Sequence, residues 1–297
     1  MELKLAQPFS LDLTLCCGQA FRWEKIGDFW HGIVKNKPLK MKQKGNILEF
    51  KNASRDFVES YFRLEDDLPS ILTEIMRDQH IENAVKTLKG LRILRQDPWE
   101  CLISYICATY KNIPAIKRML YNLSMKFGEK KTLDGCAFHT FPSAERLAHA
   151  SLKQLAECGL GYRAKYVSET AKKVANGEFQ IENLKTESYE KAREKLLTLP
   201  GVGLKAADCI MLFSLEKLQA FPVDVWVKRI IIKYYADHFE KDFVKKISFK
   251  KSLTKTDYER LSLFGRKYFG TYAGYAQEYL FHFERIMTKQ PKLGFLY

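Results

Sequence analysis

The segment Leu199–Arg229 reads LPGVGLKAADCIMLFSLEKLQAFPVDVWVKR and contains the most informative pattern in the chain. A helix is expected to end at Pro200, followed by the turn Gly201-Val202-Gly203 and a second helix. Both glycines can adopt left-handed dihedrals and allow a ligand to approach the backbone closely. Because the second helix directs free N–H groups and its positive dipole end at the turn, the segment predicts a phosphate-binding site.

Three side chains in this segment could carry chemistry. Lys205 lies in the first turn of the second helix, where a cation opposes the helix dipole. Cys209 follows four residues later and therefore shares its face of the helix. Asp224, in the run Phe-Pro-Val-Asp-Val, is predicted to cap the helix that starts at residue 225. The Pro-Gly-x-Gly turn alone favours a plain helix–turn–helix with a surface lysine and an ordinary capping aspartate over a functional site.

The composition favours a soluble protein with a polyanionic partner. The chain has 297 residues, a formal net charge of +14 and 13% aromatic residues, which together favour nucleic acid as a partner. Since there is no apolar run near ~20 residues, no transmembrane helix is expected. The N-terminus lacks the pattern of a signal peptide, so an intracellular location in the cytoplasm or nucleoid is expected.

Two kinds of patterning divide the chain, which predicts an α+β protein. Residues 1–97 contain short alternating or β-rich segments typical of an antiparallel sheet, at Phe21–Trp23, Phe29–Val34, Leu39–Lys42 and Ile47–Phe50. From Pro98 onward the helical period dominates. We therefore predict an N-terminal antiparallel β/α domain over 1–97 and a larger all-α domain over 98–297.

Several motifs resemble one known family. LPGVGLKAAD followed by PVDVWVKR is similar to the helix-hairpin-helix DNA glycosylases. CGQAFRW at 17–23, CGLGYRAKYV at 158–167 and FGTYAGYAQEYLF at 269–281 resemble the 8-oxoguanine DNA glycosylases of that superfamily (HhH-GPD), in a bacterial or archaeal variant. The resemblance spans nearly the whole chain. It implies a TATA-binding-protein-like N-terminal sheet and a monomeric DNA repair enzyme that acts on 8-oxoguanine in duplex DNA.

The resemblance assigns the two catalytic roles. It implies that the amine of Lys205 attacks the sugar C1′, expels the base and forms a Schiff base, which permits β-elimination at the 3′ phosphate. Asp224 would stabilise positive charge at C1′ and help to move the lysine proton. Because the amine must be neutral to attack, burial or nearby cations are expected to depress its pKa.

The resemblance also implies how the lesion is recognised. Gln277 would read the Watson–Crick edge of the flipped purine, while Phe281 and Cys209 would pack against its two faces. The main-chain carbonyl of Gly18 would accept the N7–H of 8-oxoguanine. Guanine carries an acceptor at N7 instead, so this carbonyl would attract the lesion and repel the normal base.

Contacts with the rest of the DNA are implied at two further places. In the gap-filling loop, Tyr110 and Lys111 replace asparagines of the animal enzymes, and Ala115 replaces an arginine that contacts the opposite cytosine. We therefore predict weak discrimination among opposite bases. The residues implied in DNA contact are Asn112, Tyr162, Arg163, Gly201, Gly203 and Trp226.

No cofactor and no catalytic metal are expected. No cysteine follows Cys209, so the chain lacks the ligands for the iron–sulfur cluster of endonuclease III-type relatives. The resemblance allows a structural metal ion at the hairpin, held by the main-chain carbonyls of Leu197, Leu199 and Val202. Two other functions stay open: a glycosylase for alkylated bases, whose members lack the lysine, and a non-catalytic helix-hairpin-helix DNA-binding protein.

Overall fold

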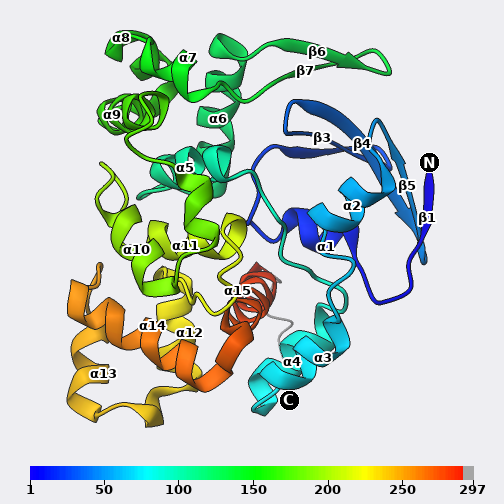
Figure 1. Cartoon of the computed structure of the whole chain (residues 1–297). Coiled ribbons are helices and arrows are strands. Elements are labelled where there is room, and N and C mark those ends of the chain that lie inside the picture. The colour runs from blue at the N-terminus through cyan, green and yellow to red at the C-terminus, as the bar shows by residue number, and fades with distance from the viewer. Residues whose placement is uncertain (290–297) are drawn as a thin grey trace.

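A computed structural model describes residues 1–289, which form a β-sheet packed beside a larger group of helices. In Figure 1 the sheet lies at the right, with the helices that precede residue 98 on the same side. Most of the other helices lie at the left, and α15 (Ala273–Lys289) lies near the centre. This arrangement confirms the predicted α+β class. No helix among the described residues is long and apolar enough to cross a membrane.

Five antiparallel strands form the sheet, in the order β1-β5-β4-β3-β2. The two-residue turn between β3 and β4 consists of Lys35 and Asn36, both with positive φ, which suits the right-handed twist of the flanking strands. Alternate residues of the strands face α1 and α2 and bury a core that includes Trp23, Met41 and Phe50. The strands and covering helices are β1 (Glu2–Lys4), β2 (Trp23–Ile26), β3 (Phe29–Val34), β4 (Lys37–Lys44), β5 (Ile47–Lys51), α1 (Leu11–Cys16) and α2 (Arg55–Tyr61).

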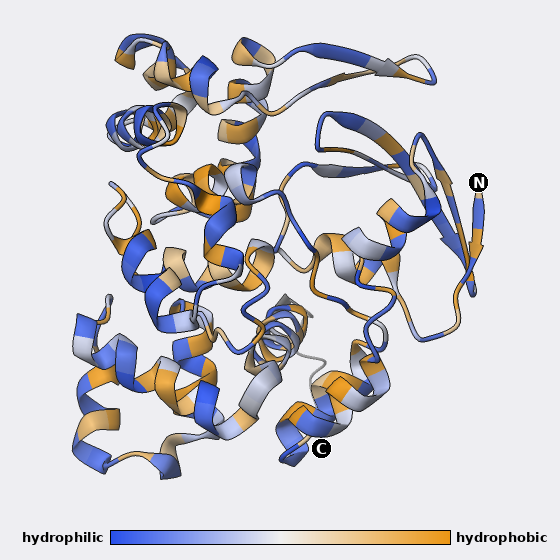
Figure 2. Ribbon diagram, viewed as in Figure 1, coloured by the Kyte–Doolittle hydropathy of each residue, from blue (hydrophilic) through white to orange (hydrophobic). Residues whose placement is uncertain are grey.

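A second and larger hydrophobic core lies among the helices. α5 is buried along nearly its whole length, and Figure 2 shows its apolar residues in the middle of the helical group. α3 and α4 precede residue 98, yet their buried residues belong to this core; the domain limits 1–97 and 98–297 stay a prediction. The helices are α3 (Leu68–Ile75), α4 (Gln79–Thr87), α5 (Pro98–Cys107), α6 (Ile113–Phe127), α7 (Ala144–Ala148), α8 (Leu152–Leu155), α9 (Arg163–Ala175), α10 (Tyr189–Leu197), α11 (Leu204–Ser214), α12 (Val225–Tyr234), α13 (Lys241–Ser248), α14 (Lys255–Phe269) and α15.

The helical half is not purely helical, which corrects the prediction of an all-α domain. β6 (Lys130–Leu133) and β7 (Cys136–His139) form a two-stranded ribbon joined by Asp134 and Gly135. Figure 1 shows this ribbon extending toward the edge of the sheet. Lys40 and Lys51 of the sheet both pair with Asp134, so the ribbon connects the two halves.

Gln19 fixes the N-terminal chain against the helical half. This fully buried side chain accepts the N–H of Leu94 at 2.8 Å and donates to the carbonyl of Arg92 at 2.8 Å. Its own carbonyl accepts bonds from Gln96 and from the hydroxyl of Tyr105. A buried amide with its hydrogen bonds satisfied is rigidly held. The neighbouring Gly18 is therefore placed next to α5.

Candidate active site

The turn between α10 and α11 has the predicted hairpin form, but its two glycines differ. Gly201 has φ +81°, and a Cβ there would lie 2.8 Å from the ring of Tyr166. Gly203 has φ −94° and caps α11 in extended backbone, so the expectation of left-handed dihedrals is wrong for this residue. A Cβ on Gly203 would meet no atom within 4 Å, which leaves space for a ligand at the helix N-terminus.

Lys205 lies in the first turn of α11, directed toward α5. Its Nζ lies 5.0 Å from the centre of the Tyr105 ring, and the amine is hydrogen-bonded to the thiol of Cys209. Burial by itself lowers the pKa of this amine, but Cys209, Asp224 and Glu278 outweigh burial and raise the pKa above its ordinary value. The expected depression of the pKa is therefore wrong, because the Cys209 thiol and the carboxylates of Asp224 and Glu278 outweigh burial.

Asp224 caps α12, as predicted. Its Oδ1 accepts the N–H of Val227 at 2.8 Å. The same carboxylate acts electrostatically on Lys205 and on Cys209. One side chain thus fixes the start of a helix and supplies negative charge near the amine.

The four residues proposed to recognise the base lie around one region. Gly18 has φ +110°, and a Cβ there would lie 2.8 Å from Nη1 of Arg285. The guanidinium of Arg285 also lies 5.2 Å from the ring centre of Phe281. Gln277 is 5% exposed, and its Oε1 has no hydrogen-bond partner. Cys209, whose thiol is hydrogen-bonded to the amine of Lys205, is also buried. The specific base contacts stay a prediction.

Glu278, next to Gln277 on α15, is a residue of the site that the sequence pattern did not predict. Its side chain is 3% exposed, and Oε1 has no hydrogen-bond partner. Burial raises the pKa of Glu278 to about 7, although the Cys17 thiol and Arg285 favour the charged form. The signal that could have identified it is an acidic residue next to Gln277 in the largely apolar run GYAQEYLF (274–281).

The loop before α6 and the start of α9 form a second part of the site. Tyr162 is 56% exposed and Tyr110 is 85% exposed with φ +53°. Asn112 is exposed and caps α6 by accepting the N–H of Ala115. Arg163 is buried beneath them and donates to the carbonyl of Thr109. Arg163 thus connects α9 to the loop, and its contact with the opposite base stays a prediction.

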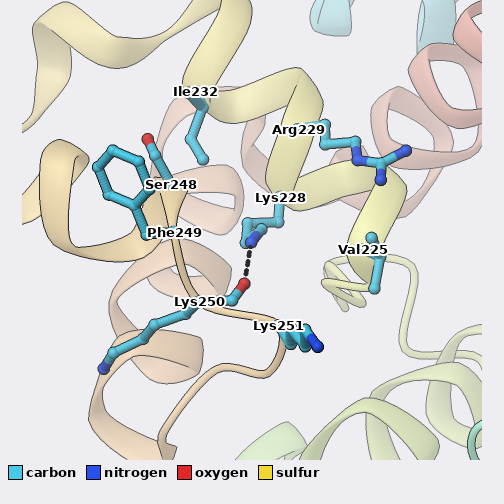
Figure 3. Close-up of a pocket in the computed structure, with 8 residues that line it drawn as sticks. All are labelled: Val225, Lys228, Arg229, Ile232, Ser248, Phe249, Lys250 and Lys251. Atoms are coloured by element: carbon cyan, nitrogen blue, oxygen red, sulfur yellow. Dashed lines mark hydrogen bonds between the residues drawn. The ribbon is translucent and has the colours of Figure 1, made fainter.

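Next to Asp224, α12 borders a cationic cavity of about 460 Å³ that residues 248–251 line on the other side (Figure 3). Lys228 is buried and donates to the carbonyls of Ile247 and Lys250, so it holds the loop in place. Within residues 1–289, no carboxylate pairs with Arg229 or Lys251. Arg229 lies over the half-buried ring of Trp226 at 5.7 Å. The cavity thus offers two free cations to a phosphate.

A buried charge network supports the hairpin from behind. Asp208 on α11 is fully buried and pairs with Arg193 on α10 at 3.2 Å. It also accepts hydrogen bonds from Tyr189 at 2.7 Å and from Tyr258 on α14. Because these partners belong to α10 and α14, the network fixes the orientation of α11 and hence of Lys205.

The only metal ion predicted for this protein is a structural one at the main-chain oxygens of the hairpin. The described residues contain no group of three or more His, Cys, Asp or Glu side chains that could hold an ion. The carbonyls proposed for a hairpin ion belong to Leu197, Leu199 and Val202. That of Leu199 already accepts the N–H of Val202 at 3.2 Å, which leaves it one lone pair. Neutral carbonyl oxygens suit a hard cation, and this site stays a prediction.

Two family patterns cover most of the chain. Residues 2–102 match the family described as "8-oxoguanine DNA glycosylase, N-terminal domain". Residues 103–250 match the "HhH-GPD superfamily base excision DNA repair protein". The fold and the hairpin therefore define a base excision DNA repair protein of the helix-hairpin-helix class.

Individual relatives define the family more narrowly. An N-glycosylase/DNA lyase of Saccharomyces cerevisiae is 35% identical, over 90% of this chain and 81% of the relative. The N-glycosylase/DNA lyase OGG1 of Arabidopsis thaliana is 32% identical, over 92% and 76%. A solved structure of the 8-oxoguanine glycosylase/lyase of Clostridium acetobutylicum contains double-stranded DNA with cytosine opposite 8-oxoguanine. It superposes on this chain with a TM-score of 0.85 at 32% identity, and the match covers 97% of this chain and 98% of that one. The chain belongs to the N-glycosylase/DNA lyase family of 8-oxoguanine DNA glycosylases.

Proposed function

We propose that this protein is a bifunctional 8-oxoguanine DNA glycosylase and AP lyase. The observation that carries the proposal is the placement of the Lys205 amine. The amine lies at the hairpin, where it is hydrogen-bonded to the thiol of Cys209 and interacts electrostatically with Asp224. Cys209 also belongs to the set of base-recognition residues. A nucleophile beside a base pocket and a phosphate-binding turn is the arrangement that this chemistry requires.

The first step replaces the bond between sugar and base. The amine of Lys205 gives up a proton, and its lone pair forms a bond to C1′ of the flipped nucleotide. The C1′–N9 bond breaks, and its electron pair leaves with the base, which takes up a proton. Positive charge develops at C1′ during this step, so the nearby Asp224 carboxylate stabilises the transition state. The raised pKa of Lys205 means that proton loss must precede attack.

The second step cleaves the strand. The C1′–O4′ bond opens with a proton going to O4′, which leaves a Schiff base between C1′ and Lys205. This cation withdraws electrons and makes a C2′ proton acidic. When a base removes that proton, the C3′–O3′ bond breaks and the 3′ phosphate departs. Because the covalent intermediate is an imine, reduction by borohydride preserves it as an amine.

Lesion choice is proposed to rest on Gly18 and Gln277. The Gly18 carbonyl accepts N7–H, which 8-oxoguanine carries and guanine lacks. Gln277 presents a buried Oε1 without a partner, and a buried acceptor of this kind is stabilised when a donor of the flipped base meets it. Duplex DNA is held by the N–H groups of the hairpin and by the exposed Tyr162. We propose that the protein acts as an intracellular monomer.

Borohydride trapping on a duplex with one 8-oxoguanine tests the proposal. Wild type is expected to form a covalent adduct and K205Q none, while K86Q, an exposed lysine of α4, serves as a control that traps normally. Base release without an adduct would indicate a glycosylase without lyase activity. Equal, salt-governed binding to 8-oxoguanine and guanine duplexes without release would indicate a non-catalytic DNA-binding protein.

A further inference from the structure

Arg285 is a cation at the base pocket to which neither the sequence analysis nor the proposed mechanism gives a role. It lies on α15, one helical turn after Phe281, and its guanidinium lies 5.2 Å from that ring centre. Nη2 donates to the carbonyl of Cys16 at 2.7 Å. Nη1 lies 2.8 Å from the position that a Cβ of Gly18 would take. The side chain therefore borders two of the four residues proposed to hold the base.

The Nη1 end of this guanidinium makes no hydrogen bond within the part of the chain that the structure describes. Nη1 is buried and has no hydrogen-bond partner, and among residues 1–289 no carboxylate forms an ion pair with Arg285. A buried donor without an acceptor costs free energy. Nη2, by contrast, is held by Cys16 and lies 3.3 Å from Nδ1 of His282. The contact between Nη2 and His282 fixes the plane of the guanidinium, and Nη1 is therefore held near Gly18.

The chemistry of the lesion offers an acceptor at this place. On the edge of 8-oxoguanine that carries N7–H, the carbonyl oxygens O8 and O6 lie on either side of that donor. If the Gly18 carbonyl accepts N7–H, an N–H group beside Gly18 faces one of these two oxygens. The Gly18 carbonyl is an acceptor and the Arg285 N–H beside it is a donor. This pair complements N7–H, a donor, and the carbonyl oxygen next to it on the base edge, an acceptor.

We propose that Arg285 is a specificity-determining residue whose Nη1 donates a hydrogen bond to the carbonyl oxygen beside N7–H of the flipped 8-oxoguanine. This inference rests on the proposed function. It also gives Arg285 a part in excision. When the C1′–N9 bond breaks, the electron pair that leaves with the base spreads onto its carbonyl oxygens. A guanidinium bonded to one of them stabilises the departing base more strongly than the bound one.

The test compares two substrates that share every step except base release. R285M and R285K are assayed in single turnover on a duplex with 8-oxoguanine and on a duplex with a preformed abasic site. R260M is the matched control, because Arg260 also lies over an aromatic ring, that of Phe243 at 4.1 Å, but on the surface of α14. R285M is expected to excise 8-oxoguanine roughly 10- to 100-fold more slowly. Cleavage of the abasic site should change little, and R285K should recover part of the loss.

The outcomes separate the two proposals. Unchanged 8-oxoguanine excision by R285M, or an equal loss on the abasic duplex, would overturn the role of Arg285 and leave the proposed function intact. If wild type releases no 8-oxoguanine, the proposed function fails and this inference fails with it. Affinities in a K205Q background identify the oxygen, since 8-oxoadenine keeps O8 and N7–H and replaces O6 by an amino group. An equal loss of affinity for both lesions in K205Q/R285M indicates O8, and a loss for 8-oxoguanine alone indicates O6.

Discussion

Replacing Glu278 by glutamine should stabilise the protein at alkaline pH and leave it nearly unaffected at acid pH. The buried carboxyl has a folded-state pKa of about 7 against an ordinary value of 4.5. Because the pKa is raised on folding, its contribution to stability is greatest below 4.5 and is lost as the pH rises through 7. The difference between the folded-state pKa and the ordinary pKa corresponds to about 3 kcal/mol of unfolding free energy, because one pKa unit corresponds to about 1.4 kcal/mol.

The assay is denaturant unfolding of wild type and E278Q between pH 5 and pH 8. Glutamine has no charged form, so the stability of E278Q relative to wild type should grow by up to about 3 kcal/mol across this range. E178Q removes an exposed carboxylate and is expected to follow wild type. A difference between E278Q and wild type that stays constant from pH 5 to pH 8 would refute the reasoning, since it would mean that Glu278 ionises as it does in water.

Three further predictions concern the hairpin and the surface near it. G203A should fold normally but bind DNA more weakly, because its Cβ enters the open space at the turn. G201A should instead lose about 1–2 kcal/mol of stability, because residue 201 has a positive φ. Thermal unfolding and DNA-binding measurements distinguish the two variants. D208N should lower the free energy of unfolding by about 3 kcal/mol, since it breaks a buried ion pair, as measured by urea titration. Y162A and Y110A should slow 8-oxoguanine excision without altering thermal stability, because each removes an exposed ring available to stack in opened DNA; unchanged single-turnover rates for both would contradict this role.

The sequence predicted the parts of the site that depend on local structure. The end of α10 shortly before Pro200 and the cap at Asp224 follow from backbone chemistry within a few residues. Which of the two turn glycines has positive φ does not, because Gly201 is held by packing against Tyr166 from another helix. The ribbon of β6 and β7 was missed although Asp134-Gly135 is a strong hairpin signal.

Part of the electrostatics of Lys205 could not be predicted from its neighbours in the sequence. Cys209 and Asp224 raise the pKa of the amine most strongly, and Glu278, which α15 brings to the site from the far end of the described chain, adds a smaller contribution. The inward direction of Arg163 likewise depends on the carbonyl of Thr109, from another helix end. Both facts arise from tertiary packing, which residue spacing does not report.

The bond from Arg285 to Cys16 joins residues 269 positions apart, and this separation affects how the protein becomes active. During synthesis, the hairpin with Lys205 emerges from the ribosome well before α15 does. The nascent chain can therefore form the turn that binds phosphate before it can form the pocket that selects a base. Contacts between such distant segments also form late and slowly in folding. The pocket that we propose to select the lesion can thus be completed only when α15 docks against the residues beside Gly18.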